Sequence, residues 1–415
     1  MTYSKTSQCG LIMLILLLTA CSQPQMPTAD PSPIPLPTQT TRPTATGDST
    51  STYTFRRIAP LADELPKLYT QFDVQVRAPA DGSVWVITHQ AAARWNGQTW
   101  NPIHVLEEGM LADVDDSGRL WVLRQDAEEI RAWQNGKWTT YGAPSGWTSA
   151  HIDLPWRITS RKDGTLWLPT ATDVRHFDGE RWTLHTLQEM GFPVLQEEDR
   201  WIIHQIAASE AGEQTWVGEC YWAGPGPVGG AGVRWHTGQT WLGALAPVGP
   251  VCVSVIHTDP TGNVWIGVPE AVWRYEPSSQ MWASFPVPDT SEAEQYNFTY
   301  PIDLVADASG DAWIHLQYCG GASCDTGHTR LYRLHNEEWS QIFDMREYSM
   351  FLQQLALPGS GQGWLFWDGS VYRLLGDTVE PVTALAAIGM DVSPEGKLWV
   401  VTSDGNGSAL WMLEP

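Results

Sequence analysis

The stretch Asp163-Gly164-Thr165-Leu166-Trp167-Leu168 sets the pattern from which this chain of 415 residues is built. Variants of it recur along the sequence, and in seven of eight copies a glycine stands three residues before the tryptophan. Glycine at that position permits the positive φ of a tight turn, and the apolar residues after it indicate a strand. The eight repeated tryptophans are Trp85, Trp121, Trp167, Trp216, Trp265, Trp313, Trp364 and Trp399.

Each copy continues with two further aromatic or aliphatic positions, which complete a unit of four strands. Between them lie Asn96-Gly97, Asn135-Gly136 and Asp178-Gly179, and such pairs are strong hairpin signals. Four antiparallel strands in roughly 35 to 50 residues are typical of a β-propeller blade. We therefore predict an all-β, eight-bladed β-propeller. A seven-bladed ring is the alternative, if the unit around Trp364 forms no sheet of its own.

The tryptophans are expected to fill the core between neighbouring blades. A buried indole removes roughly 150 to 250 Å² from water, which at about 25 cal/mol per Å² corresponds to an upper bound of roughly 4 to 6 kcal/mol each. The last unit has no fourth strand after Trp411. Thr54 to Ile58, just ahead of the first unit, can supply it, so we expect an N-terminal strand to pair into the last blade and close the ring.

Residues 1–21 have the features of an export signal. One charge, Lys5, precedes the apolar run from Leu11 to Leu18, which is too short for a stable membrane span. The following Leu18-Thr19-Ala20-Cys21 resembles a bacterial lipobox, which implies cleavage before Cys21, transfer of diacylglycerol to its sulfur and acylation of its amino group, for example with palmitate. The alternative is an ordinary secretory signal in which Cys21 is incidental.

A segment rich in proline, threonine and serine, residues 22–51, separates this signal from the repeats. It has too few large apolar residues to repay the entropy of ordering, so we expect a disordered tether. The propeller then occupies residues 52–415. These features predict a cell-envelope protein that faces outside the cytoplasm, attached to the lipid bilayer through acylated Cys21 in the cytoplasmic or the outer membrane.

Cysteine use agrees with an oxidising compartment. Besides Cys9 and Cys21 there are four cysteines, which allow three pairings: Cys220, Cys252, Cys319 and Cys324. We favour a disulfide between Cys220 and Cys252 across consecutive blades, and another between Cys319 and Cys324 within one loop. Four free thiols are the alternative. No CxxC or HExxH spacing occurs and the histidines are scattered, so we expect neither a metal nor a cofactor.

The formal net charge of −23 bears on the choice of partner. An acidic surface repels phosphate backbones and anionic headgroups, so nucleic acid and peripheral membrane binding are disfavoured. Neutral or cationic partners fit better, although acidity also serves solubility. We expect a monomer whose partner is an extracellular ligand or an envelope protein.

The long insertions are predicted to lie on one face of the ring. The first and third turns of each unit are short, so the long segments fall on the opposite face, where function most often resides on a rigid scaffold. These segments are Tyr141–Leu154, Leu184–Arg200, Tyr221–Ala231, Ala283–Tyr300 and Gln317–Thr329. Aromatic rings beside carboxylates suit sugars, cations or peptides. The ligand-binding candidates are Tyr221, Trp222, Tyr318, Trp147, His151, Trp201 and Tyr296; the alternative is that these loops only pack their own aromatics.

The repeat resembles the two-component regulator propeller repeat of bacterial sensors. Matching stretches include Asp81 to Val86 with Ala93-Arg94-Trp95-Asn96-Gly97, and Gly232-Val233-Arg234-Trp235. The resemblance covers about residues 70–415. It implies a sensor-type propeller outside the cell, here without a kinase or regulator region after the repeats, and therefore the binding half alone, presented on a lipid anchor and without catalytic activity.

Two other functions remain open at this point. The repeat is also similar to that of streptogramin-lyase-like propellers, so a lyase or glycoside hydrolase using His151 or His204 with acidic loop residues is an alternative. A structural part of a cell-envelope assembly is another.

The stretch from Asp113 to Gly118 could be read as a calcium loop, but a plain turn fits better because no bidentate glutamate follows.

Overall fold

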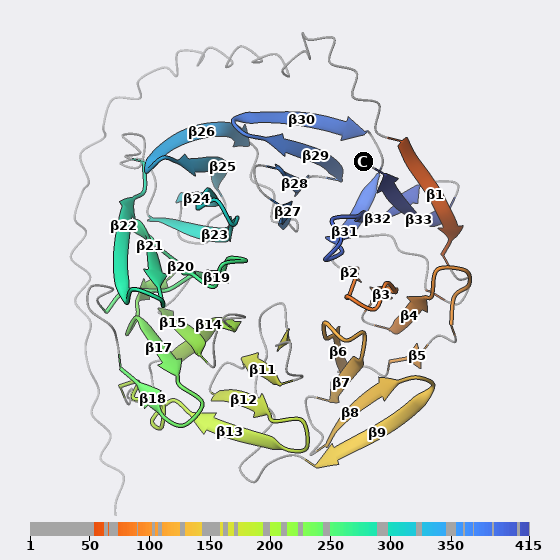
Figure 1. Cartoon of the computed structure of the whole chain (residues 1–415), viewed down its shortest axis with the longest axis horizontal. Coiled ribbons are helices and arrows are strands. Elements are labelled where there is room, and N and C mark those ends of the chain that lie inside the picture. The colour runs from red at the N-terminus through yellow and green to blue at the C-terminus, as the bar shows by residue number, and fades with distance from the viewer. Residues whose placement is uncertain are drawn as a thin grey trace, which may run out of the picture. The chain divides into compact units, whose positions relative to one another are not determined.

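The computed structural model is an eight-bladed β-propeller (Figure 1). It describes residues 54–61, 65, 74–88, 90–101, 104–106, 110–124, 129–142, 158–160, 165–169, 173–193, 200–208, 214–222, 227–243, 250–288, 298–320, 326–345, 354–359, 362–367, 369–383, 386–404 and 407–414. All of them belong to the compact unit Thr50–Pro415. Within these residues there is no helix long and apolar enough to cross a bilayer.

Each blade is one antiparallel sheet, and in the first seven blades the main strands follow in chain order from the centre of the ring outward. Blade 1 contains β2 (Gln75–Arg77), β3 (Val84–Ile87), β4 (Ala91–Trp95) and β5 (His104–Val105). Blade 2 contains β6 (Met110–Val114), β7 (Leu120–Arg124), β8 (Glu129–Gln134) and β9 (Lys137–Gly142). Blade 3 contains β10 (Thr159–Ser160), β11 (Leu166–Pro169), β12 (Asp173–Phe177) and β13 (Trp182–Thr186).

Blade 4 has an additional short strand that pairs only with its second strand. Its strands are β14 (Arg200–Ala208), β15 (Thr215–Trp222), β16 (Pro227–Gly229), β17 (Val233–His236) and β18 (Trp241–Leu242). Blade 5 contains β19 (Val255–Thr258), β20 (Val264–Val268), β21 (Ala271–Glu276) and β22 (Met281–Pro286). Blade 6 contains β23 (Phe298–Ala306), β24 (Ala312–Gly320), β25 (Thr326–His335) and β26 (Glu338–Met345).

The last two blades include the point at which the ring closes. Blade 7 contains β27 (Gln354–Gly359), β28 (Gln362–Trp367), β29 (Ser370–Leu375) and β30 (Thr378–Thr383), so the unit around Trp364 does form its own sheet. Blade 8 contains β31 (Ala387–Val392), β32 (Leu398–Asp404), β33 (Gly407–Glu414) and, as its fourth strand, β1 (Thr54–Pro60).

Closure by the N-terminal strand is confirmed. Strand β1 runs antiparallel to β33 from Thr54 opposite Glu414 to Pro60 opposite Ala409, and Arg57 lies opposite Trp411. Figure 1 shows β1, in red, beside the blue strands of the chain's other end. One apolar cluster continues from blade 8 into blade 1 and includes Val401 and Val76, so the ring is sealed by packing as well as by hydrogen bonds.

The repeated tryptophans occupy equivalent places, as predicted. Each lies on the second strand of its blade, and six of them are at most 1% exposed, while Trp364 and Trp399 are 8% and 9% exposed. Trp121 of blade 2 packs edge-on against Phe177 and Trp182 of blade 3, with ring centroids 5.0 and 5.8 Å apart. The indoles therefore form the core between consecutive sheets.

An aspartate organises the turn before several of these tryptophans. Asp115 Oδ1 accepts hydrogen bonds from the backbone and hydroxyl of Ser117, and its Oδ2 accepts one from Trp121 Nε1 at 2.8 Å. Asp259 and Trp265 repeat the arrangement at 2.9 Å. The carboxylate of Asp115 is thus engaged within its own turn, as the plain-turn interpretation predicts.

The innermost strands are linked to one another by aspartates, of which Asp113 is fully buried. The aspartates of β6, β23 and β31 each accept a backbone N–H from the innermost segment of the next blade: Asp113 from Ile158 at 2.8 Å, Asp303 from Leu355 at 2.9 Å, and Asp391 from Ala78 at 2.7 Å. In blade 5 His257 takes the corresponding place and bonds the backbone of Ala306. These bonds connect adjacent blades near the centre of the ring.

Candidate functional site

The candidate site is the insertion face, which we define as the side of the ring that carries the turns between second and third strands and the links between blades. In blade 5 the hairpin on this face closes at Val268 opposite Ala271, three residues after Trp265. In blade 6 the same hairpin runs to Gly320 opposite Thr326, seven residues after Trp313. The four additional residues add roughly 13 Å at about 3.3 Å per residue.

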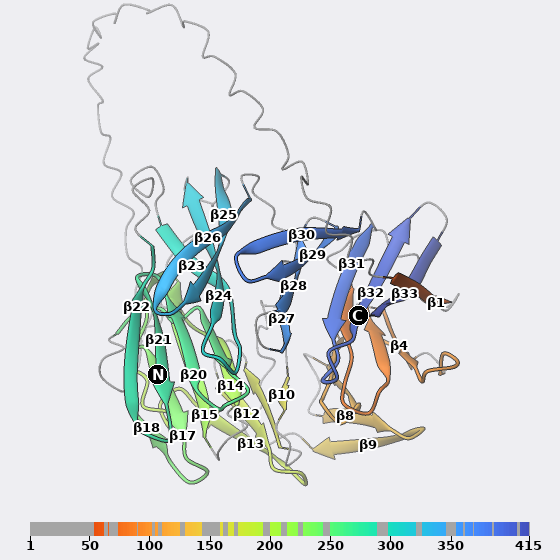
Figure 2. The same ribbon diagram turned by 45° about the horizontal axis from the view of Figure 1, so that its top comes forward.

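Blade 4 is extended in the same direction. Strand β15 runs to Trp222, six residues after Trp216, so it is three residues longer than its blade 5 equivalent. Its inner neighbour lengthens in step, with Arg200 opposite Trp222. Strand direction repeats from blade to blade, so the extensions of blades 4 and 6 leave the ring on the same face, one on either side of blade 5. Figure 2 shows the blade 6 hairpin of β24 and β25 at the edge of the ring.

Two of the five long segments form extended hairpins over much of the length that the structure describes. Most residues of Gln317–Thr329 that the structure describes lie in a continuous ladder between β24 and β25. Within Tyr221–Ala231, strand β16 pairs with β15 through Gly229 opposite Tyr221. The physical reason is that the inner strands β14 and β23 extend as well, so each insertion gains a hydrogen-bonded neighbour on its inner side.

Three of the predicted ligand-binding residues come together in blade 4. Trp201 lies directly opposite Tyr221 in the β14–β15 ladder, and Trp222 is the next residue along β15. The other candidates from the links, Trp147, His151 and Tyr296, lie outside the described residues. The backbone thus gathers Trp201, Tyr221 and Trp222 at the far end of one extended hairpin.

Tyr318 does not belong with them. Its side chain is fully buried, its hydroxyl lies 3.1 Å from that of Tyr332, and the guanidinium of Arg330 lies 5.1 Å from its ring centroid. Burial raises the pKa of its phenol. Tyr318 continues the inward alternation of Ile314 and Leu316 along β24, a signal already present in the sequence. We therefore remove it from the candidate ligand-binding residues.

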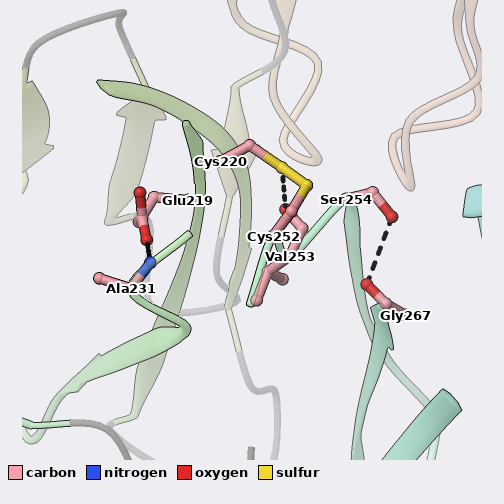
Figure 3. The surroundings of a disulfide bond; sticks show 7 residues. All are labelled: Glu219, Cys220, Ala231, Cys252, Val253, Ser254 and Gly267. Carbon is pink, nitrogen blue, oxygen red and sulfur yellow. Dashed lines mark hydrogen bonds between the residues drawn. A yellow bond between two sulfur atoms is a disulfide. The ribbon is translucent and has the colours of Figure 1, made fainter. Parts of the chain in front are cut away.

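The predicted disulfide between Cys220 and Cys252 is present (Figure 3). Their Cα atoms are 4.4 Å apart, and the two residues are 0% and 4% exposed. The bond joins the second strand of blade 4 to the segment that enters blade 5. The proposed partner of Cys319, Cys324, lies outside the described residues, so that second disulfide remains a prediction.

A buried acid next to this disulfide was missed by the sequence reasoning. Glu219 is fully buried, and its Oε1 accepts a hydrogen bond from the backbone N–H of Ala231 (Figure 3). Its Oε2 has no partner within the described part of the chain. Burial raises the pKa of Glu219 to about 9, against smaller opposing effects of Arg234 and the Gly232 backbone. A signal existed in the sequence: of the eight residues that stand three places after the repeated tryptophans, Glu219 is the only acidic one.

Arg234 completes the base of the blade 4 insertion. Its guanidinium donates to the carbonyls of Ala231 at 3.0 Å, Val233 at 2.9 Å and Gly191 at 3.0 Å. It also lies 4.6 Å from the ring centroid of Phe192. Burial lowers the pKa of Arg234, and Glu219 partly offsets that effect. The carboxyl and the guanidinium therefore hold the two backbone polar groups of Ala231.

The side chains of the two histidines named for catalysis lie outside the described part of the structure. His151 lies outside the described residues, and of His204 only the backbone in β14 is described. Among the residues that the structure describes, no three histidine, cysteine or acidic side chains are grouped to hold a metal ion. The buried His315 is in blade 6, whereas Glu219 is in blade 4, so these two titratable groups belong to different blades.

His315 provides a prediction about acid stability. It is fully buried, neither ring nitrogen has a partner among the described residues, and burial lowers its pKa from 6.5 to about 3. Below pH 6.5 the unfolded chain takes up a proton that the folded chain refuses, so the free energy of unfolding should fall by up to about 1.4 kcal/mol per pH unit. We expect His315→Leu to remove this contribution, so that the slope of unfolding free energy against pH, measured by urea unfolding between pH 6.5 and 4, falls by up to that amount.

A matched control is Leu316→Met on the same strand, which changes buried volume little and carries no titratable group. It should keep the wild-type slope of stability against pH. An identical slope in His315→Leu and wild type would contradict the assignment.

Comparison with known proteins identifies no family for this chain. No family model matches the sequence, and no curated protein matches it significantly. Solved structures similar to it include virginiamycin B lyase from Staphylococcus aureus, with 13% identity, a TM-score of 0.40, and coverage of 88% of this chain and 100% of that one. Another is the extracellular domain of the hybrid two-component system BT4673 from B. thetaiotaomicron, with 14% identity, a TM-score of 0.40, and coverage of 85% and 51%.

PorZ, a surface component of the type-IX secretion system of Porphyromonas gingivalis, is similar at 16% identity and a TM-score of 0.42, with coverage of 81% of this chain and 50% of that one. This chain thus spans about half the length of the BT4673 domain and of PorZ. Similarity at such low sequence identity concerns the propeller fold alone and indicates nothing about ligand or activity.

Proposed function

We propose that this protein is a lipid-anchored, extracytoplasmic propeller that binds a glycan, a peptide or an envelope protein on its insertion face and acts as a sensor-type module without catalysis. The observation that carries the proposal is the extension of blades 4 and 6 on one face, beyond the short blade 5 between them. The blade 4 extension brings Trp201, Tyr221 and Trp222 to adjacent backbone positions. Rigid aromatics at such a site suit sugars and peptides.

Two features support the compartment. The leader ends in the lipobox-like Leu18-Thr19-Ala20-Cys21. The disulfide between Cys220 and Cys252 fits an oxidising space. Lipidation is tested directly by mass spectrometry of the mature N-terminus, which should carry a diacylglyceryl group and an amide-linked acyl chain on Cys21; an unmodified Cys21 in a processed or unprocessed chain would contradict the anchor.

The role of the insertion face is tested by Trp222→Ala. In a soluble chain starting at Thr52, this change should weaken binding to muropeptides or to a captured envelope protein by roughly 5- to 30-fold, the effect of losing an aromatic anchor worth about 1 to 2 kcal/mol. The measurement is equilibrium titration by calorimetry or fluorescence. Tyr221→Ala should act in the same direction.

The control is Trp138→Ala on the outer strand β9, where the indole is 44% exposed and the residue lies away from the insertion face. Binding should be unchanged in this variant. Equal affinities for wild type, Trp222→Ala and Tyr221→Ala would place the ligand elsewhere on the ring and end this proposal.

A further inference from the structure

The blade 4 insertion is fastened to the ring at its return point. The chain leaves β15 at Trp222, pairs with it again through β16, and reaches Ala231 two residues before β17. At Ala231 the backbone N–H donates to Glu219 and the carbonyl accepts from Arg234. One residue earlier, Gly230 packs so closely that an added Cβ would lie 2.4 Å from the Val251 carbonyl oxygen. The return point is thus held from both sides of the backbone.

Glu219 and the neighbouring Cys220 fasten β15 on opposite sides of the strand. Figure 3 shows its carboxyl directed toward Ala231, while the neighbouring Cys220 is joined to Cys252 on the other side of the strand. The disulfide ties β15 to blade 5, and Glu219 ties β15 to the returning end of its own insertion. The ribbon that carries Tyr221 and Trp222 therefore has a covalent constraint near its start and a hydrogen-bonded constraint at its end.

We infer that Glu219 is a positioning residue for the insertion face: its carboxyl fixes the backbone of Ala231 and so keeps β16 paired with β15 in a single register. This inference rests on the proposed function for its consequence in binding, but its structural part can be tested without any ligand.

The surroundings of the carboxyl explain why it works in the neutral form. From β17 the charged group facing it is Arg234, and from the segment entering blade 5 the nearby cysteine is held in the disulfide. Arg234 donates to three carbonyls, and within the described residues no hydrogen bond joins its guanidinium to the Glu219 carboxyl. A protonated carboxyl keeps its carbonyl oxygen as an acceptor for the Ala231 N–H without placing a bare charge in a fully buried site.

The titration of Glu219 makes the inference measurable by hydrogen exchange. Opening of the ribbon that exposes Glu219 to water lets it lose its proton above its ordinary pKa, so opening is favoured by rising pH until the folded pKa of about 9 is reached. The protection factor of the Ala231 amide, corrected for intrinsic base catalysis, should therefore fall about tenfold per pH unit, or roughly 100-fold between pH 6 and 8. In Glu219→Gln it should stay flat across that range.

Two variants separate the contact from the charge. Glu219→Gln retains an acceptor for the Ala231 N–H and should keep wild-type protection at pH 6, whereas Glu219→Ala should lose at least tenfold in the 221–232 segment. Glu276→Ala, at an exposed glutamate of blade 5, is the control and should change nothing there. If Glu219→Ala does not fold, the pH dependence of wild type against Glu219→Gln still decides the question.

The inference is overturned if the protection factor of the Ala231 amide is independent of pH in the wild type, or if it falls with pH in Glu219→Gln as well. It is also overturned if the amides of β28 in blade 7 lose protection to the same extent, because the whole ring would then be unfolding. With muropeptide as probe, Glu219→Gln should bind like wild type at pH 7 and Glu219→Ala at least fivefold more weakly. Altered exchange with no muropeptide binding by any variant would overturn the proposed function instead.

Discussion

A chain that begins at Leu61, and so lacks strand β1, should no longer unfold as one cooperative unit. Strand β1 supplies the fourth strand of blade 8, and its Phe55 and Ile58 pack onto the apolar clusters on either side of that blade. Without it, β33 becomes a free edge and Leu410 and Leu413, which are now at most 2% exposed, lose cover. We expect loss of most of the roughly 5 to 15 kcal/mol that holds a typical domain folded, measured by calorimetry and urea unfolding.

The control is a chain that begins at Thr52, which retains β1 and should unfold like the full-length mature protein. A synthetic peptide of residues 52–61 added to the truncated chain should restore a single transition, with a midpoint that rises with peptide concentration. A truncated chain that unfolds at the same urea concentration as the control would contradict the closure of the ring through β1.

Replacing Asp113 by alanine should produce the largest effect of any single substitution considered for this protein, about 3 to 5 kcal/mol of unfolding free energy. Its carboxylate is fully buried and accepts hydrogen bonds from Arg77 Nε at 2.8 Å, Gln75 Nε2 at 3.2 Å and Ile158 N at 2.8 Å. Burial lowers the pKa of Arg77, but Asp113 and Asp391 raise it more, so the guanidinium stays charged. Without Asp113, a largely buried cation and a backbone donor of the next blade lose their acceptor.

Urea unfolding at pH 7 measures the loss, and Asp178→Ala is the matched control. Asp178 accepts backbone hydrogen bonds in an exposed hairpin turn and forms a surface pair with Arg181, so its removal should cost no more than about 1 kcal/mol. A loss below about 1 kcal/mol in Asp113→Ala would show that the link between blades 2 and 3 does not depend on this carboxylate.

The ring itself could be predicted because its signals are local and repeated. The glycine turn before Trp265 and its equivalents fixes the start of the second strand, and the residues around Asn135-Gly136 fix the last hairpin. Closure followed from a missing strand rather than from any motif, and the pairing of Arg57 with Trp411 confirms it. The disulfide between Cys220 and Cys252 could be predicted because blades that follow one another in the chain are neighbours in the ring.

What could not be predicted depends on neighbours from other units. The alternation of Ile314, Leu316 and Tyr318 puts these residues on one face of β24, but the cover of that face by blade 5 decides that Tyr318 is buried. The raised pKa of Glu219 depends on its burial in the folded blade, and its hydrogen-bond partner Ala231 lies 12 residues further along the chain. The role of Asp113 depends on Ile158, which lies in the next blade and 45 residues further along the chain. No window of sequence contains such pairs.

The pairing of Thr54 with Glu414 has a consequence for how such a ring can arise and be rebuilt. Two residues that face each other across an antiparallel ladder can be joined by a short turn, which would make the backbone a covalent circle. The circle could then be opened between any two blades, for example between β22 and β23, with the same sheets in the same order. Duplication of a gene for this fold, followed by loss of its two ends, could therefore yield a circular permutant that begins at a different blade and folds into the same ring.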